Sequence, residues 1–513
     1  MMQPGSKTQS KSKSGLGEIA GSDFGYAQAR HLLWRAGFGG TPTQIQKLVS
    51  WGPEKSVDTL LEGTRIEGDP PSFSEFDKDI MRPATEEERA AQAAARRSQN
   101  EDVLAKFRNE RQARERDDRR QMAEMQKWWL KRMIETPRPL EEKMTLFWHG
   151  LLATSYRTIE NSFHMLKQNE MFRRNATGNF GQMLFELIRD PAMLAYLDNN
   201  DSRKGRANEN LAREIMELFA LGIGNYTEND IKEGARALTG YTFVDDDFVF
   251  QRNNHDTGEK SIFGKKGNFD GDGFVRAILE RRECSQYIAE RVYGFFCSDV
   301  PPAERGGSKT LPDEQRAAIK SMSNALLAAK YDMKPMLKKL FMSEHFYSPT
   351  FMNEQIKSPV VLVVGAARSL NTPTRDLSIL TDALDLMGQN IFFPPSVKGW
   401  EGGRSWINTS TLFVRQNIMA YLLTGKKPQG YDANADEQRY DPTGLLSELQ
   451  AEGKASDPAA VADYMMRLTL GHAPSHASEP LREFLRATGD RVDRDTLTGL
   501  VLLITSMPEY QLC

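Results

Sequence analysis

Cysteine and histidine are scarce in this sequence of 513 residues, which has three cysteines and seven histidines. Cys284, Cys297 and Cys513 show neither a metal-binding nor a redox spacing, so we interpret the first two as core residues and the third as part of a tail. The sequence also lacks a Gly-x-Ser-x-Gly elbow, a His-Glu-x-x-His pair, a Walker loop and a Cys-x-x-Cys pair. These absences remove support for the common hydrolases, zinc peptidases and ATPases that can be read from sequence.

An excess of charge of one sign is missing as well. The 67 basic and 70 acidic residues leave a net charge of -3, which creates no overall field that favours nucleic acid. No stretch reaches the length of a membrane span, and residues 1–17 are polar and lack the apolar run of a secretory signal. We therefore expect no nucleic-acid partner, no membrane span and, by default, a cytoplasmic location.

Helical periodicity dominates what is present, and it predicts a mainly α-helical, multi-helical globular protein. Residues from about 85 to 134 are rich in Ala, Arg, Glu and Gln, which indicates one long, charged and largely solvated helix. The only strand signal, at about 241–263, predicts one small β-hairpin with Asp-Thr-Gly near its turn. The predicted parts are a disordered tail (1–22), a helical core (23–425), a linker (426–442) and a C-terminal helical extension (443–513).

The densest set of functional side chains lies in the helix predicted for residues 208–221. Residues three to four positions apart share one face of a helix, so the segment has a polar and an apolar stripe. The polar stripe consists of Asn210, Arg213, Glu214 and Glu217, and the apolar stripe of Leu211, Ile215 and Leu218. Such a polar stripe can bind a ligand, hold a metal or supply a general acid and base. The alternative interpretation is an amphipathic helix with internal ion pairs.

Two further segments carry candidate residues. A carboxylate beside a histidine, as in His255-Asp256, can fix the imidazole tautomer, or both groups can bind a cation. The alternative is a turn-stabilising aspartate with an exposed histidine. The loop at 400–408 contains two tryptophans, an arginine and an amide, which is typical either of a surface that binds polar ligands or of a loop anchored by tryptophan.

Several stretches together resemble the bacterial family called "domain of unknown function 1800". The most specific are EKMTLFWH (142–149), NENLAREIMELF (208–219), HDTGEK (255–260) and FPPSVKGW (393–400), and the resemblance extends over most of residues 24–510. It implies no settled activity. Because genes of the two families often lie side by side, it implies a protein partner from the family "domain of unknown function 1501".

The chain departs from the family pattern at two places. Relatives often continue Phe-Trp-His with Asn-His-Phe, whereas this sequence has Gly150-Leu151-Leu152 after His149, so a His-x-His metal pair is absent. Many relatives also look exported, while this N-terminus is polar.

Two functional hypotheses follow. The first is a binding or assembly protein with a polar cleft formed by residues 198–217, the His255-Asp256 turn and the loop at 400–408. The alternative is a hydrolytic enzyme in which Glu214 or Glu217 acts as general base and Arg213 or Arg404 stabilises negative charge. The candidate catalytic residues are Glu214, Glu217, His255 and Asp256. The candidate ligand-binding residues are Asp198, Asn208, Glu209, Asn210, Arg213, Lys260, Trp400, Arg404, Trp406 and Asn408. The sequence indicates no metal site and no particular cofactor.

Overall fold

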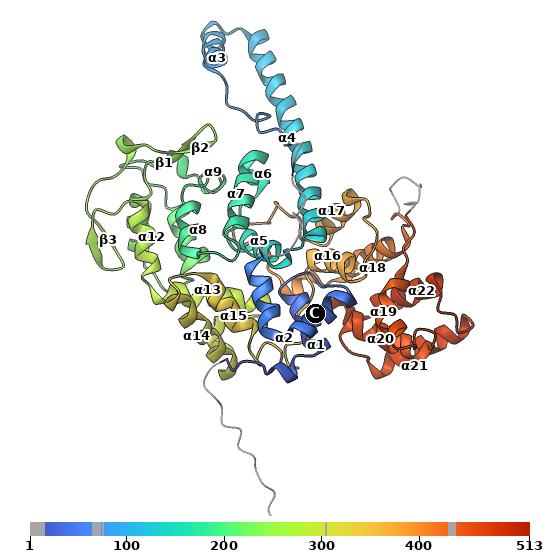
Figure 1. Ribbon diagram of the computed structural model, residues 1–513. Helices are drawn as coiled ribbons and strands as arrows, with labels where there is room; N and C mark the ends of the chain where they lie inside the picture. The colour runs from blue at the N-terminus through green and yellow to red at the C-terminus, as the bar shows by residue number, and fades with distance from the viewer. Residues whose placement is uncertain (1–15, 64–72, 74–75, 303–304, 429–437) are drawn as a thin grey trace, which may run out of the picture.

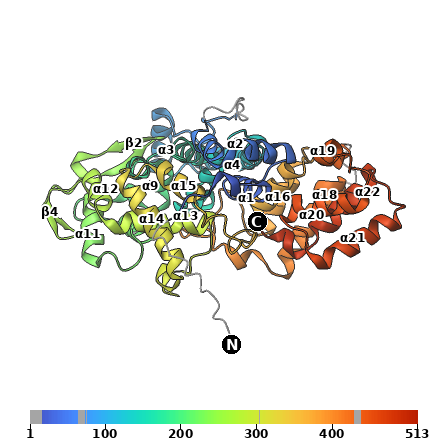
Figure 2. The same cartoon turned by 60° about the horizontal axis from the view of Figure 1, so that its bottom comes forward.

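The computed structural model describes residues 16–63, 73, 76–302, 305–428 and 438–513, and it is mainly helical, as predicted. A central group of helices lies between two lateral regions, and a helical arm projects from it (Figure 1). In Figure 2 the strands lie at one end of the molecule and the C-terminal helices at the other. No helix within the described ranges combines the length and the apolar character that a membrane span requires.

The centre is built where apolar helices approach one another closely. Every residue of the segment Pro359–Ala367 is buried, and Gly365 allows this helix to pack directly on Trp34, since a Cβ at Gly365 would lie 2.4 Å from the indole. A larger residue at 365 would therefore push the two helices apart. The central helices are α1 (Tyr26–Arg35), α2 (Pro42–Glu62), α5 (Pro139–Leu151) and α16 (Pro359–Ser369).

The arm consists of two helices, α3 (Glu86–Ser98) and α4 (Glu101–Glu135), so the prediction of one continuous helix over 85–134 is wrong. The helices are separated where Gln99 takes a left-handed conformation (φ 50°) and Asn100 caps α4 by accepting a hydrogen bond from the Val103 N–H (3.2 Å). The prediction of a largely solvated helix holds only for the projecting half. Further along α4, Met125 and Trp129 are fully buried.

One lateral region carries two hairpins, which corrects the prediction of a single hairpin over 241–263. Strand β1 (Tyr241–Val244) pairs with β2 (Asp247–Phe250), and β3 (Lys260–Ile262) pairs with β4 (Lys265–Gly267), both antiparallel. The second turn uses Phe263 and Gly264, both at positive φ, as tight two-residue turns require. The Asp-Thr-Gly segment lies between the hairpins instead of forming their turn.

Helices surround these hairpins and connect them to the centre. They are α6 (Tyr156–Ile159), α7 (Ser162–Arg174), α8 (Phe180–Leu187), α9 (Pro191–Tyr196), α10 (Asn210–Glu214), α11 (Glu228–Ala237), α12 (Gly271–Leu279), α13 (Arg282–Phe296), α14 (Asp313–Ala328) and α15 (Met333–Phe341), with the π-helix η3 (Ile215–Ala220) and the short 3-10 helices η2 (Asn199–Asp201), η4 (Arg252–Asn254) and η6 (Gly307–Thr310).

The C-terminal helices form the opposite lateral region and are attached to α1. Arg30 is buried there and donates hydrogen bonds to the carbonyls of Leu468 (2.8 Å) and Thr469 (2.6 Å). The elements are α17 (Leu377–Leu386), η7 (Gly403–Trp406), α18 (Thr409–Thr424), η8 (Pro442–Leu446), α19 (Ser447–Ala451), α20 (Pro458–Leu470), α21 (Ser475–Ala487), α22 (Arg494–Thr505) and η9 (Pro508–Gln511).

The predicted tail, linker and C-terminal residue differ in part from the structure. Residues 1–15 of the tail and 429–437 of the linker lie outside the described residues. Residues 16–22 are attached to the core, because Ile19 is buried and its N–H donates to the Met342 carbonyl (2.8 Å), just before η1 (Gly21–Asp23). Cys513 is buried as well and exchanges backbone hydrogen bonds with Gln355, so it is not part of a free tail.

Candidate functional site

The predicted site residues form three polar groups, at 198–217, 255–260 and 400–408. The hollows on the described surface include one of about 480 Å³ among residues 443–492 and one of about 180 Å³ between α4, α6 and Phe393. Neither hollow is lined by a residue that the sequence analysis placed in a cleft. The chemistry of the three groups therefore follows from their own contacts.

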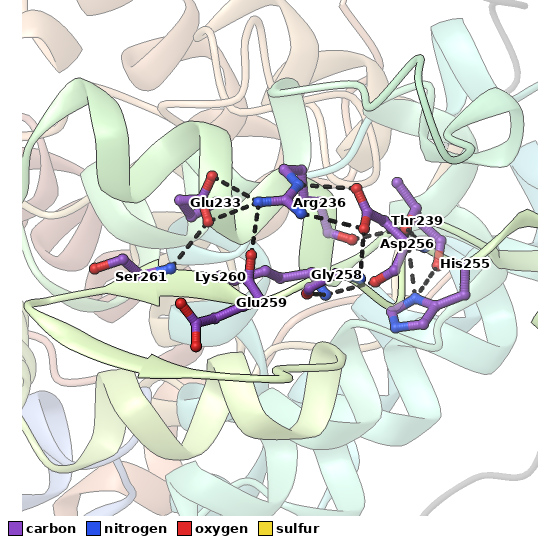
Figure 3. A network of polar contacts seen from close by, with 9 residues as sticks. All are labelled: Glu233, Arg236, Thr239, His255, Asp256, Gly258, Glu259, Lys260 and Ser261. Carbon is purple, nitrogen blue, oxygen red and sulfur yellow. Dashed lines mark hydrogen bonds and ion pairs between the residues drawn. The ribbon is translucent and has the colours of Figure 1, made fainter.

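The segment His255–Lys260 is held against α11 by a network centred on Arg236 (Figure 3). The Arg236 guanidinium donates to the Asp256 carboxylate (2.8 and 3.2 Å), to the Glu233 carboxylate (2.9 and 3.0 Å) and to the Glu259 carbonyl (3.1 Å). Lys260 is buried, and its ammonium donates to the carbonyls of Asp256 (2.5 Å) and Gly258 (3.2 Å). The carboxylates of Asp256 and Glu233 thus share the Arg236 guanidinium, while the Lys260 ammonium is bonded to backbone carbonyls.

Asp256 also builds the turn itself. Its carboxylate accepts a hydrogen bond from the Gly258 N–H (2.9 Å), and its own N–H donates to the Thr239 hydroxyl (2.8 Å). The hydrogen bonds from Arg236 lower the pKa of Asp256 to about 2. This is the geometry of a turn-stabilising aspartate, whose oxygens are already used by the protein.

His255 bonds to Thr239 and not to Asp256, which differs from the expected pairing. The ring is buried, and its Nδ1 lies 2.9 Å from the Thr239 carbonyl oxygen. Because a carbonyl only accepts, Nδ1 carries a proton and donates this hydrogen bond. The orientation of the ring is therefore set by the backbone just after α11.

The residues at 198–210 shape the chain before α10. The Asn208 side chain donates to the Asp198 carbonyl (2.9 Å) and accepts from the Asn210 N–H (2.9 Å). Asp198 takes a left-handed conformation (φ 55°), which Asn and Asp adopt more readily than most residues. The amide of Asn208 is thus used to close a loop, whereas the side chains of Asp198 and Asn210 are exposed.

Arg213 is neutralised by Glu209, which belongs to the predicted site, and by Glu228, which does not. It donates to Glu209 (3.1 Å) and to both carboxylate oxygens of Glu228 (3.0 Å each). The internal ion pair predicted by the amphipathic-helix interpretation is therefore present on this face. It leaves Glu214 and Glu217 without a direct bond from Arg213.

The helix changes from α to π geometry between these two carboxylates, at Ile215. In the wider π turn, burial alternates in pairs of residues. Residues 211–212, 215–216 and 219–220 are buried, while residues 213–214 and 217–218 are partly exposed. Leu218, which we placed in the apolar stripe, consequently lies beside Glu217 at the partly exposed positions. A π segment of this kind is frequent at functional sites.

Glu214 is a partly buried carboxylate that makes no hydrogen bond or ion pair with any described residue. Burial raises its pKa, and the nearby charge of Glu217 raises it further, while Arg213 and Lys398 act in the opposite direction. Glu217 accepts one hydrogen bond, from the Tyr226 hydroxyl (3.1 Å). Two neighbouring carboxylates with free acceptor positions therefore lie on one face of the molecule.

The 400–408 loop is anchored by its tryptophans. Trp406 is buried, and the Trp400 ring packs edge-on against His149, with 5.5 Å between centroids. Asn408 caps α18 by accepting from the Thr411 N–H (2.9 Å), and Arg404 is exposed. These contacts are those of a tryptophan-anchored loop, whose two charged residues, Glu401 and Arg404, are exposed.

Metal binding and covalent chemistry find little support in these groups. Among the described residues, no three His, Cys, Asp or Glu side chains are close enough together to hold a metal ion. His149 is a buried core residue whose Nε2 accepts from the Phe392 N–H (3.0 Å), and burial lowers its pKa to about 3. It is therefore neutral and already bonded at neutral pH.

Sequence reasoning missed three residues: Lys398 and Tyr226, which lie near Glu214 and Glu217, and Arg236, the centre of the network around Asp256. Lys398, whose charge acts on Glu214, belongs to the family-specific stretch FPPSVKGW and could have been chosen on that ground. Tyr226 and Arg236 carry no comparable signal, because a lone tyrosine or arginine in a helical region is unremarkable. Only the folded chain brings them to the carboxylates.

A model of the family described as "Protein of unknown function (DUF1800)" matches residues 31–512, nearly the whole chain. No curated protein and no solved structure matches it.

Proposed function

Because the chain belongs to the DUF1800 family of proteins of unknown function, whose description names no activity, we propose a function from the site itself. We propose a binding or assembly protein that uses the carboxylates of Glu214 and Glu217 to hold a group that donates hydrogen bonds. The main support for this proposal is the Glu214 carboxylate, which is partly buried and makes no hydrogen bond or ion pair with any described residue.

Partial burial removes part of the hydration of this carboxylate, and no described residue donates a hydrogen bond to it in return, which costs free energy. A ligand or partner that supplies an N–H, O–H or cationic group would restore the missing bonds and offset that cost. The negative charge of Glu217 next to it favours a cationic donor over a neutral one. A lysine or arginine of a protein partner fits these requirements, and the "domain of unknown function 1501" family remains our proposed source of that partner.

Calorimetry tests the proposal by measuring the affinity between this chain and a purified protein of that second family. Glu214→Gln and Glu217→Gln should each weaken the complex at least about tenfold, or roughly 1.4 kcal/mol. Glu452→Gln is the matched control, since Glu452 is an exposed glutamate of the C-terminal region paired only with Lys454 (2.9 Å). Unchanged affinity in both site variants would refute the proposal for this partner.

The alternative function is hydrolysis with Glu214 as general acid or base, which its raised pKa favours. His255 and Arg404 do not strengthen it, because His255 bonds to Thr239 and Arg404 extends into solvent. An enzyme would show hydrolysis of a nitrophenyl ester or glycoside that Glu214→Gln abolishes. Tight binding lost in the same variant, without turnover, would instead support the binding protein.

A further inference from the structure

The hollow between α4 and α6 is a second candidate site, independent of the proposed function. It encloses about 180 Å³ and is lined by Glu115, Arg119, Tyr156, Arg157, Glu160 and Phe393. Pockets for drug-sized ligands measure about 300–1,000 Å³, so this one suits a smaller molecule. It lies at the base of the projecting arm, where α4 enters the body of the protein.

Three hydrogen bonds fix the walls of the hollow relative to one another. The Tyr156 hydroxyl donates to the buried Asp118 of α4 (2.8 Å), and the Tyr156 N–H donates to the Phe392 carbonyl (2.9 Å). The Gln126 side chain of α4 donates to the Ile391 carbonyl (3.0 Å). Helix α4, helix α6 and the loop before Phe393 are thus joined in pairs, so the relative positions of these three segments are set before any ligand binds, whereas Arg119, Arg157 and Glu160 are exposed side chains.

The charged groups of the hollow are mostly unused by the protein. Arg119, Arg157 and Glu160 make no side-chain hydrogen bond or ion pair with any described residue, although their charges would allow one. Glu115 is different, because Arg111 on the same helix donates to it (2.8 Å). Two guanidinium groups and one carboxylate therefore remain available to a ligand.

The apolar part of the lining is aromatic. The rings of Tyr156 and Phe393 pack edge-to-face with 5.5 Å between centroids. The Tyr156 hydroxyl is engaged by Asp118, so it is not free to bond a ligand in the hollow. Such a wall favours a small hydrocarbon group.

We propose that this hollow binds a small zwitterion of the α-amino acid class with an apolar side chain. Arg119 and Arg157 would hold the carboxylate, as paired guanidinium groups do, and Glu160 would accept from the ammonium group. The aromatic wall would cover the side chain. A simple oxyanion would use the arginines but leave Glu160 without a partner, so the combination of both charges distinguishes the zwitterion.

Calorimetry on the full chain with L-valine, valinamide and 3-methylbutanoate tests this assignment, because the two analogues each lack one charge of the amino acid. L-valine should bind at millimolar concentration, and either analogue should bind at least about tenfold more weakly. Arg157→Gln and Arg119→Gln should each weaken the binding of L-valine at least about tenfold. Glu160→Gln should weaken the binding of L-valine but leave the binding of 3-methylbutanoate unchanged. If Glu160 had only a structural role, both ligands would be affected alike.

Arg116→Gln is the matched control, an exposed arginine of α4 that does not line the hollow. It should leave L-valine binding unchanged, and melting curves of all variants check that they are folded. Absence of L-valine binding at roughly 10 mM would overturn the proposal. Equal binding of 3-methylbutanoate or inorganic phosphate would also overturn it, in favour of a plain oxyanion site.

Discussion

The segment His255–Lys260 and the segment Glu214–Glu217 both lie within the matched residues 31–512, yet their charged groups have different partners. In the first, Arg236 and Lys260 occupy the oxygens of Asp256, Glu233 and the neighbouring carbonyls. In the second, Glu214 has no bonded partner among the described residues and Glu217 has one. A polar motif thus stabilises the fold where its side chains are fully hydrogen-bonded to other residues, and it is available to a ligand where they are not.

Removing the hub of the first segment should have the largest effect. Arg236→Met would leave the carboxylates of Glu233 and Asp256 without their cation, and we expect the free energy of unfolding to fall by about 2–4 kcal/mol. Urea unfolding followed by circular dichroism measures it. Arg203→Met is the control, because Arg203 is exposed and its side chain makes no hydrogen bond or ion pair with a described residue. Equal stability of the two variants would remove the contrast between the segments.

A smaller loss is expected for the buried histidine. His255→Ala would remove the hydrogen bond to the Thr239 carbonyl and leave a cavity, lowering the free energy of unfolding by about 1–3 kcal/mol. Partner affinity, measured at a temperature where the variant is folded, should not change. A loss of affinity without loss of stability would instead place His255 in the binding site.

The acid dependence of stability should identify Asp256 as a structural group. Its pKa is lowered to about 2, so its ionised form stabilises the folded state above the unfolded pKa of 3.8, and this contribution is lost as the pH falls from 3.8 towards 2. Wild type should therefore exceed Asp256→Asn in melting temperature at pH 7, and the difference should shrink below about pH 3. A difference independent of pH would contradict the role of the carboxylate charge.

The smallest effect on stability, with opposite sign, is expected at Glu214. Because its folded pKa is raised, the ionised carboxylate destabilises the folded state, and stability falls as the pH rises through 4.5 and above. Glu214→Gln should be as stable as wild type at pH 4 and slightly more stable at pH 7, by a few tenths of a kcal/mol for a partly exposed group. Melting curves at both pH values test this, and a clear loss of stability at pH 7 would contradict an unpartnered carboxylate.

Local signals explain which elements were predictable. The boundary between α8 and α9 has a local cause, because Asp190 caps α9 by accepting from the Met193 N–H (2.9 Å) and Pro191 lies in its first turn. The break between α3 and α4 was missed because the charged composition continues on both sides of Asn100, although Asn is a favoured N-cap residue, and the left-handed turn at Gln99 appears only in the structure. The second hairpin was missed because its strands have three residues each, too few for a period to be recognised.

By itself, the sequence determined the helical class, the family and the residues at which carboxylates, arginines and tryptophans are concentrated. These properties depend on periodicity and on motifs, which are local. Only the tertiary structure decided which charged groups have a bonded partner. Arg236 bonds to Asp256, twenty positions later in the chain, and Arg213 bonds to Glu228 and not to Glu214. Arg119 and Arg157 line the same hollow between two helices. The physical reason is that burial and hydrogen bonding between distant segments set the state of a charge, and neither is encoded in the spacing of residues along the chain.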